Sequence, residues 1–293
     1  MNYLLLSILL NGYIGVVFVF FNKYKVDLFQ AIVFNYITCV VTGSVVIGQF
    51  PLQVSTIDKP WFKFALLMGA LFISVFNIIA VSSVKAGVTA TQTSNKLSLI
   101  IPVLFSWYFY HENIGWVKWL GIALALVAVI FTISKDKKSI KQKSLLVYLL
   151  PLLLFVGSGI IDTLTKYAEK HFIKNDATAN AYLIAGFFVA AFIGSLLLLF
   201  LYIFGKKKFH FKNLLAGIIL GIPNYFSIFY LIKALGSDAL SSSAIIPINN
   251  IGVLFVVSLF GIFIFKEKIS RLNYFGILLT IVAILLIYYG DKI

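Results

Sequence analysis

The sequence has few of the residues that keep a protein soluble in water. Only 12% of its 293 residues are charged, whereas soluble domains average about 25%. Acidic residues number 10 against 24 lysines and arginines, which gives a formal net charge of +14. Hydrophobic residues make up 61% of the chain, and the mean hydropathy is +1.02. This composition excludes a soluble globule and predicts an integral membrane protein.

Residues that build catalytic and metal centres are also scarce. The single cysteine, Cys39, excludes an intrachain disulfide. The three histidines fall at separate span ends, and the acidic residues are scattered singly along the chain. The sequence therefore lacks metal-ligand spacings, carboxylate clusters and a phosphate-binding glycine loop. We expect no enzymatic activity, no metal and no cofactor, and the alternative of a membrane enzyme acting on lipids is disfavoured.

Long polar segments are absent as well. The longest polar connection is 135–144, which leaves no room for a soluble domain. Apolar runs of about 20 residues, the length that crosses a hydrocarbon layer of about 30 Å, fill most of the chain. They do not alternate as the strands of a membrane β-barrel would. We predict ten spans at 3–21, 28–49, 61–84, 88–110, 115–134, 145–168, 178–204, 213–235, 239–265 and 271–290.

The two halves of the chain carry a similar pattern. Glu112 and Glu267 each follow an apolar stretch, and the offset of 155 residues between them also places Asn95 on Asn250. Each half holds five spans, so the second half must enter the membrane from the opposite side. The fold class that we predict is an all-α integral membrane protein with ten transmembrane helices in two inverted five-helix repeats. The repeats are 1–134 and 145–293, and a basic linker, 135–144, joins them.

Positive charge is concentrated at the ends of the spans. The connections after odd-numbered spans carry 15 lysines and arginines, and the other face carries eight. Because cytoplasmic loops are enriched in these residues, the odd connections are predicted to be cytoplasmic and both termini to lie outside. We expect a multi-pass protein of a bacterial-type inner (plasma) membrane. No basic helix with interleaved aromatic residues is found, so nucleic-acid binding is not expected.

The chain has ten predicted spans, and its duplicated stretches 107–113 and 263–270 each contain a glutamate and are each followed by a glycine-opened span. In these features it resembles the drug/metabolite transporter superfamily, EamA type. Tyr-His-Glu and Phe-Lys-Glu stand here in place of that family's Leu-Gly-Glu pattern. The resemblance covers essentially the full chain and implies a secondary transporter that moves small metabolites by alternating access, often outward. It also implies a cavity lined by spans one, three, four, six, eight and nine, and structural glutamates that cap the helix following each of them.

Two ionisable residues lie deep within predicted spans. Lys96 is in span four and Asp162 in span six, and a charge in the apolar interior must face a partner or a wet cavity. Lys96 could bind a carboxylate or phosphate, or its stem could carry the charge to the nearer interface. Asp162 could bind protons as the coupling ion, pair with Lys96, or pair with Lys166 four residues later on the same helix face.

Other polar residues complete the predicted substrate site. Gln92 and Asn95 flank Lys96, and the second half contributes Asn249 and Asn250 beside Pro247, where a helix break would expose backbone groups. The remaining candidates are Asn11, Tyr13, Asn77 and Tyr225, each of which could instead form an interhelical hydrogen bond or an aromatic belt.

The expected partners are a small-molecule substrate such as an amino acid, protons as the coupling ion, and membrane lipids, with the protein a monomer or weak dimer. A flippase for lipids or lipid-linked intermediates remains the alternative, and it would need a lateral opening. A channel is disfavoured because no selectivity filter is found.

Overall fold

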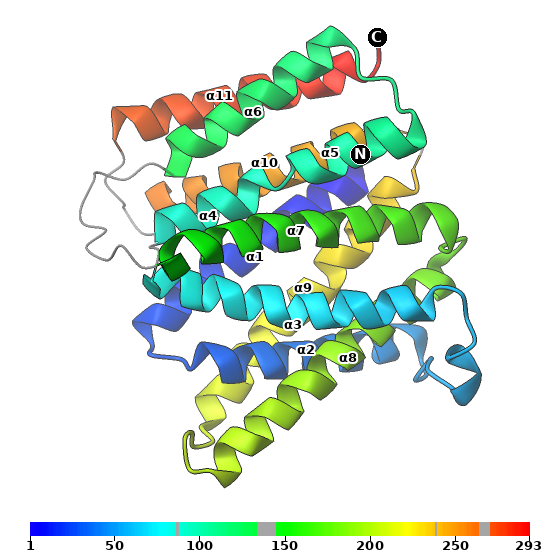
Figure 1. Cartoon of the computed structure of the whole chain (residues 1–293), viewed down its shortest axis with the longest axis vertical. Coiled ribbons are helices and arrows are strands. Elements are labelled where there is room, and N and C mark those ends of the chain that lie inside the picture. The colour runs from blue at the N-terminus through cyan, green and yellow to red at the C-terminus, as the bar shows by residue number, and fades with distance from the viewer. Residues whose placement is uncertain (86–87, 134–144, 238, 264–269) are drawn as a thin grey trace.

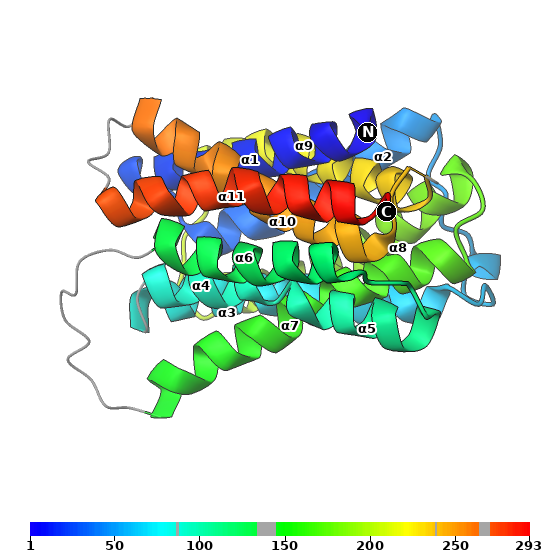
Figure 2. The same ribbon diagram turned by 90° about the horizontal axis from the view of Figure 1, so that it is seen from above.

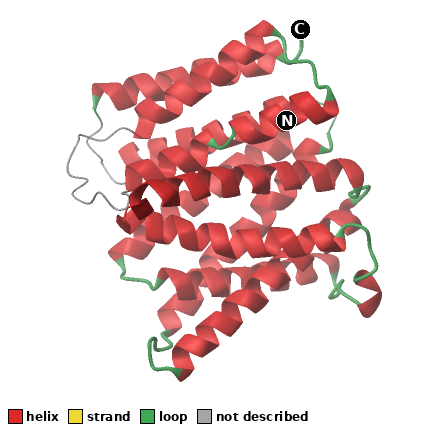
Figure 3. Cartoon of the chain, viewed as in Figure 1, coloured by secondary structure: helices red, strands yellow, loops and turns green. Residues whose placement is uncertain are grey.

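The described part of the chain is built from helices. The computed structural model describes residues 1–85, 88–133, 145–237, 239–263 and 270–293, and these ranges contain no strand (Figure 3). The helices are α1 (Asn2–Lys23), α2 (Leu28–Ile47), α3 (Phe62–Lys85), α4 (Val88–Leu97), α5 (Ile100–Tyr110), α6 (Trp116–Ile133), α7 (Leu145–His171), α8 (Asp176–Ile203), α9 (Phe211–Leu235), α10 (Ser242–Phe263) and α11 (Arg271–Gly290). A 3₁₀ turn at Val54–Thr56 lies between α2 and α3.

The predicted spans coincide with these helices. The largest differences, three residues, are at the end of α7, predicted at 168 and observed at His171, and at the start of α10, predicted at 239 and observed at Ser242. Seven helices are long and apolar enough to cross a membrane. Shorter apolar stretches, Asn2–Phe18 and Trp116–Phe131, lie in α1 and α6. The all-helical, multi-pass prediction is confirmed.

The predicted helix break lies in a different span. Pro247 is inside the continuous helix α10, so the expectation of a break there is wrong. Span four is interrupted instead, because α4 ends at Leu97 and α5 begins at Ile100. Pro102 cannot donate to the Ser98 carbonyl, and its ring crowds that group. The Ile101 amide donates to Ser98 at 3.0 Å, which closes a tighter turn.

The helices run roughly along one direction, with their connections at two ends of the bundle (Figures 1 and 2). Both chain termini and the α2 to α3 and α5 to α6 connections lie at one end, which we call the terminal end. The α1 to α2 and α8 to α9 connections lie at the other, which we call the opposite end. The main packing pairs are α6 with α11, α2 with α8 and α9, α1 with α9 and α10, α3 with α7 and α8, and α7 with α4 and α5.

Two large apolar cores stabilise this arrangement. The first centres on α2, α3, α8 and α9 and includes Tyr36, Phe187 and Tyr225, each fully buried. The second joins α1, α6, α10 and α11 and includes Ile251 and Ile287. Polar residues of α4, α7 and α10 occur where these cores adjoin, and the site is built there.

Glycines let helices approach closely at several places, among them Gly12 and Gly159. A Cβ on Gly12 of α1 would lie 2.3 Å from Val256 Cγ1 of α10. A Cβ on Gly159 of α7 would lie 2.4 Å from Ile101 Cδ1 of α5. Side chains at these positions would push the helices apart, so both contacts depend on glycine.

Candidate functional site

A hydrogen bond between Asp162 and Asn250 connects the two cores. Asn250 Nδ2 of α10 donates to Asp162 Oδ2 of α7 at 2.9 Å. Asn250 is the ninth of the 22 residues of α10 and is followed by Ile251 of the second core. Asp162 follows Ile161, which packs against the first core. Both polar residues keep partial exposure, so the pair is not sealed inside packed side chains.

Asp162 has no cationic partner at ion-pair distance among the described residues. Lys166, the helix neighbour that the sequence offered as a partner, pairs with Glu169 at 2.7 Å instead. The reading of Asp162 and Lys166 as a helix-stabilising pair is therefore wrong. The reason is that Lys166 lies near the terminal end of α7, where Glu169 is three residues further along the helix.

Lys96 lies beside the break in span four. It is the penultimate residue of α4 and is partly exposed, and it forms no ion pair or hydrogen bond with the described residues. Its charge interacts electrostatically with that of Asp162. A cation at a helix C-terminus is also favoured by the helix dipole. Both interpretations of Lys96, a binding-site residue and a snorkelling lysine, stay predictions.

Gln92 lies three residues before Asn95 and four residues before Lys96, so its side chain is a neighbour of both on the surface of α4. Gln92 and Asn95 are partly exposed, and their side-chain amides bond to none of the described residues. The Asn95 carbonyl accepts a hydrogen bond from the Ser98 hydroxyl at 2.6 Å, which orders the turn after α4. Three predicted residues of the first half therefore lie within about one turn of α4, beside the helix break.

Asn11 and Asn249 are linked through a serine that the sequence did not single out. Ser7 Oγ donates to Asn249 Oδ1 at 3.1 Å and lies 2.9 Å from the Ser227 carbonyl oxygen. Asn11 Nδ2 is 3.5 Å from Ser7 Oγ. This chain of contacts joins α1, α9 and α10. Asn249 thus faces α1 while the next residue, Asn250, faces α7.

The other three predicted residues are not brought to Asp162 by any hydrogen bond. Asn77 Nδ2 donates to the Ile73 carbonyl of its own helix at 2.7 Å. The Tyr225 hydroxyl donates to Asn180 Oδ1 within the first core. Tyr13 is 40% exposed. Each has a local environment of its own, and a role in substrate binding stays a prediction.

Ser158 is a further residue that sequence reasoning missed. It lies one helical turn before Asp162 on α7, so the two side chains share a face. Its hydroxyl oxygen is buried and has no hydrogen-bond partner among the described residues. The spacing of four residues from Asp162 was the signal that could have found it.

Glu112 caps a helix of the other half rather than the helix that follows it. Its carboxylate accepts from the Ser243 amide at 2.9 Å and from the Ser242 hydroxyl, both at the start of α10. The expectation that it caps α6 is therefore wrong, because the free amides nearest to it belong to α10. Burial raises the pKa of Glu112, but these hydrogen bonds outweigh burial and leave the pKa below its ordinary value. Glu267 lies outside the described residues.

A buried ion pair adjoins this cap. Lys118 Nζ of α6 lies 2.6 Å from Asp291 Oδ1, just after α11, and Lys118 is only 1% exposed. Asp291 also accepts from the Ser241 amide at 2.7 Å. Burial raises the pKa of Asp291, but the bonds from Lys118 and Ser241 lower it below its ordinary value. We call this group, Glu112, Lys118, Ser241, Ser242, Ser243 and Asp291, the serine junction.

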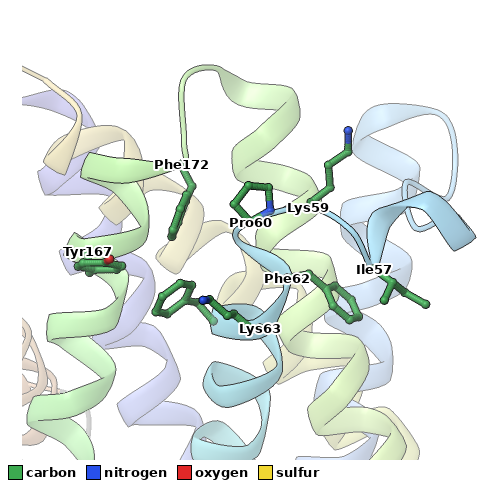
Figure 4. A pocket seen from close by; sticks show the side chains of 8 residues that line it. Ile57, Lys59, Pro60, Phe62, Lys63, Tyr167 and Phe172 are labelled. Atoms are coloured by element: carbon green, nitrogen blue, oxygen red, sulfur yellow. The ribbon is translucent and has the colours of Figure 1, made fainter.

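A surface pocket of about 350 Å³ lies away from these residues. It is open at the terminal end, between the α2 to α3 connection, the start of α3 and the end of α7 (Figure 4). Lys59, Lys63, Tyr167 and Phe172 are among its lining residues. None of the predicted site residues contributes to it, so it does not mark the predicted site. The described residues also contain no group of three or more metal-ligating side chains.

The fold and the buried polar site define a multi-pass helical membrane protein. The family model described as the EamA-like transporter family matches residues 2–134. An uncharacterised protein of Haemophilus influenzae is 30% identical over 301 residues, covering 100% of this chain and 99% of that protein. A solved crystal structure with a TM-score of 0.76 and 14% identity covers 99% of this chain and 96% of that chain, and so shares its fold. The chain belongs to the EamA-like transporter family of the drug/metabolite transporter superfamily.

Proposed function

We propose that this protein is a secondary active transporter that exports a small organic metabolite, an amino acid or a similar compound, across the inner (plasma) membrane by alternating access. The observation that carries the proposal is the arrangement of Asp162, Asn250 and Lys96. Two opposite charges sit within an apolar bundle, lack a direct ion pair in the described residues and remain partly exposed. Charges kept in such an interior usually serve a ligand or ion.

The helix packing supports ten spans in two inverted repeats. If each span is matched with the span five positions later, α1 corresponds to α7, α2 to α8 and α3 to α9. The contact of α1 with α9 then corresponds to that of α7 with α3, and the contact of α2 with α9 corresponds to that of α8 with α3. The α1 and α10 contact becomes that of α7 with α4 and α5. Two further pairs, α6 with α11 and α2 with α8, each join a span to the span five positions later, so the relation leaves these pairs unchanged. Repeats packed in this way provide the two halves that rock around a central site.

The glycine contacts support the same relation. Gly12 and Gly159 are 147 residues apart, and their partners Val256 and Ile101 are 155 apart. With the same offsets, Asp162 corresponds to Gly15 and Lys96 to Ile251. The two charges are thus departures from a symmetric scaffold. We place substrate recognition at these departures, because a ligand without two-fold symmetry needs an asymmetric site.

The chemistry of the site fits a small polar solute. Lys96 can hold a carboxylate as a point charge, and Asp162 can hold an ammonium group or a proton. Gln92, Asn95 and Asn250 supply amide donors and acceptors. The turn between α4 and α5 gives the Lys96 region irregular backbone, which is tolerated at membrane depth where it lines a cavity.

Transport by purified protein in proteoliposomes tests the proposal. Amino acids and related metabolites are first screened by thermal shift, because a ligand that binds only the native state raises its apparent stability. Counterflow of a compound that binds should then fall at least about tenfold in Lys96→Ala and in Asp162→Asn, as expected for losing a charged contact worth roughly 1.5–3 kcal/mol.

Lys166→Gln is the matched control, since it removes a charge from α7 that pairs with Glu169 away from Asp162. It should transport normally. Full counterflow in both Lys96→Ala and Asp162→Asn, with folded protein in the vesicles, would rule out this site.

A further inference from the structure

Two connections from different halves are tied together at the opposite end of the bundle. Residues 24–27 join α1 to α2, and residues 204–210 join α8 to α9. Lys207 forms an ion pair with Asp27. Lys212 Nζ donates to the Lys25 carbonyl at 2.8 Å, and Gln30 Nε2 donates to the Lys208 carbonyl at 3.0 Å. The first turns of α9 and α2 therefore each hold the backbone of the connection from the other half.

Buried amides beneath these connections make the junction rigid. Asn213 Nδ2 donates to Gln30 Oε1 at 2.9 Å, and Asn213 Oδ1 accepts from the Asp27 amide at 3.1 Å. Asn213 is 0% exposed and Gln30 is 1% exposed. Each of these two amides bonds through both its oxygen and its nitrogen, so the network holds the backbone of the two connections together.

The junction gathers lysines in excess. We call them the lysine platform: Lys23, Lys25, Lys206, Lys207, Lys208 and Lys212. Asp27 is the single acid within the two connections, and it forms an ion pair with Lys207. Lys23, Lys25, Lys206 and Lys208 are exposed and have no carboxylate at ion-pair distance among the described residues. The platform is therefore a fixed surface of unneutralised positive charge.

The lysines of the terminal end are arranged differently. There Lys118 pairs with Asp291, Lys166 with Glu169, and Lys233 with Asp176. Three of the four ion pairs of the described residues thus lie at the terminal end. Five acids of the described residues, Asp58, Glu112, Glu169, Asp176 and Asp291, lie at the terminal end beside its eight lysines, whereas the six lysines of the platform have Asp27 alone. Less of the positive charge is therefore offset at the platform.

Exposed aromatic rings border the platform. Tyr24 is 63% exposed, Phe204 60%, Phe209 53% and Phe211 62%. Phe209 packs against Phe34 of α2 with 6.0 Å between ring centroids, which anchors the α8 to α9 connection on the helices. Aromatic rings beside lysines at a span end are typical of the headgroup level of a bilayer.

We propose that the lysine platform is a binding site for the headgroup of an anionic phospholipid. Lysine ammonium groups at the bilayer surface attract phosphodiester charge, and the neighbouring rings contact the glycerol and upper acyl chain. A free phosphate ion would use the lysines but gain nothing from the rings, so the lipid is the ligand that matches both. By holding both connections, a bound lipid stabilises the junction between the two halves.

Binding to short-chain phosphatidylglycerol tests this site. Detergent-solubilised full-length protein is titrated at low salt with dihexanoyl phosphatidylglycerol or with the matched phosphatidylcholine. Each lysine contributes about 1 kcal/mol near an anionic surface, which is about fivefold in affinity. The Lys206→Gln/Lys208→Gln variant should bind phosphatidylglycerol about 25-fold more weakly, and Lys206→Arg/Lys208→Arg should retain binding. Raising the salt should weaken wild-type binding, because the charges are exposed.

The control variant is Lys59→Gln/Lys63→Gln, which removes two exposed lysines from the terminal end. It should bind as wild type does. The proposal fails if this control loses as much affinity as the platform variant, if the platform variant binds unchanged, or if phosphatidylcholine binds wild type equally well. Glycerol phosphate competing as strongly as phosphatidylglycerol would identify a soluble-anion site instead and would also overturn it. Circular dichroism and size exclusion confirm that each variant is folded.

Discussion

Single residues in this protein depend on partners that are remote in the sequence. Asp162 meets Asn250 across 88 positions, and Ser7 meets Asn249 across 242. Because burying an ionisable group costs free energy, the sequence alone identifies Asp162 and Lys96 as candidate site residues. The burial cost does not identify the partner of each charged side chain. Lys166 lies four residues after Asp162 on the same helix, but in the structure it pairs with Glu169.

The pH dependence of stability should reveal the role of Glu112. Its pKa in the folded protein lies below the ordinary value of 4.5, because bonds from Ser242 and Ser243 outweigh burial. Such a carboxylate stabilises the fold above its ordinary pKa, and this contribution is lost as the pH falls through the folded value. The unfolding temperature of purified protein should therefore drop as the pH is lowered from about 5 to about 3.

Glu112→Gln separates this effect from general acid sensitivity. The variant should be less stable than wild type at neutral pH by about 1–3 kcal/mol, the cost of weakening bonds to a buried charge, and its unfolding temperature should fall less with acid. Asp291 also has a lowered pKa and contributes a separate drop in both proteins. Parallel pH profiles for the two proteins would mean that Glu112 does not cap α10.

At the scale of elements, the apolar runs predicted the helices well and the interruption poorly. Length and composition located the described helices to within three residues, because a segment crossing the bilayer must be long, apolar and internally hydrogen-bonded. The sequence favoured Pro247 as the breaking residue, but α10 continues through it. Pro102, three residues into α5, follows the actual interruption. A proline in a helix removes one backbone hydrogen bond, and the packing of that helix against its neighbours decides whether the helix is interrupted there.

Pro102→Ala tests whether the interruption serves transport. Alanine restores the amide that Ser98 lacks and favours a continuous helix, by up to about 3 kcal/mol. The unfolding temperature should rise, and counterflow should fall at least about fivefold because the Lys96 face of α4 turns relative to α7. Pro247→Ala, within a continuous helix, is the control and should affect transport less. Normal transport by a stabilised Pro102→Ala variant would show that the interruption is dispensable.

The whole molecule joins the two halves at both ends of the bundle. The serine junction connects α6 and the α5 to α6 connection with α10 and the chain end. At the opposite end, Asp27 and Lys207 connect the α1 to α2 and α8 to α9 connections. The alternating access that we propose would require such contacts to separate in turn, so the two junctions are where the halves would have to move apart.

The orientation expected from lysine counts can be measured with introduced cysteines. Cys39 is fully buried and is replaced in a Cys39→Ser background. In that background an impermeant thiol reagent should label Lys59→Cys in intact cells and Lys206→Cys only after permeabilisation, because the lysine-rich face is retained in the cytoplasm. Cells carrying Cys39→Ser alone provide the unlabelled control. The reverse labelling pattern would invert the orientation.

The sequence by itself determined that the protein is helical and spans a membrane several times, approximately where its helices lie, and that two charged residues lie within them. These follow from composition and run length, which are local properties. Only the tertiary structure decided that Asp162 faces Asn250, that Glu112 caps α10, that span four is the interrupted one, and that six lysines of two connections and the adjoining helix ends lie together. Each of these depends on which helices pack together, and that choice is made by side-chain shape and by satisfying buried polar groups over the whole bundle.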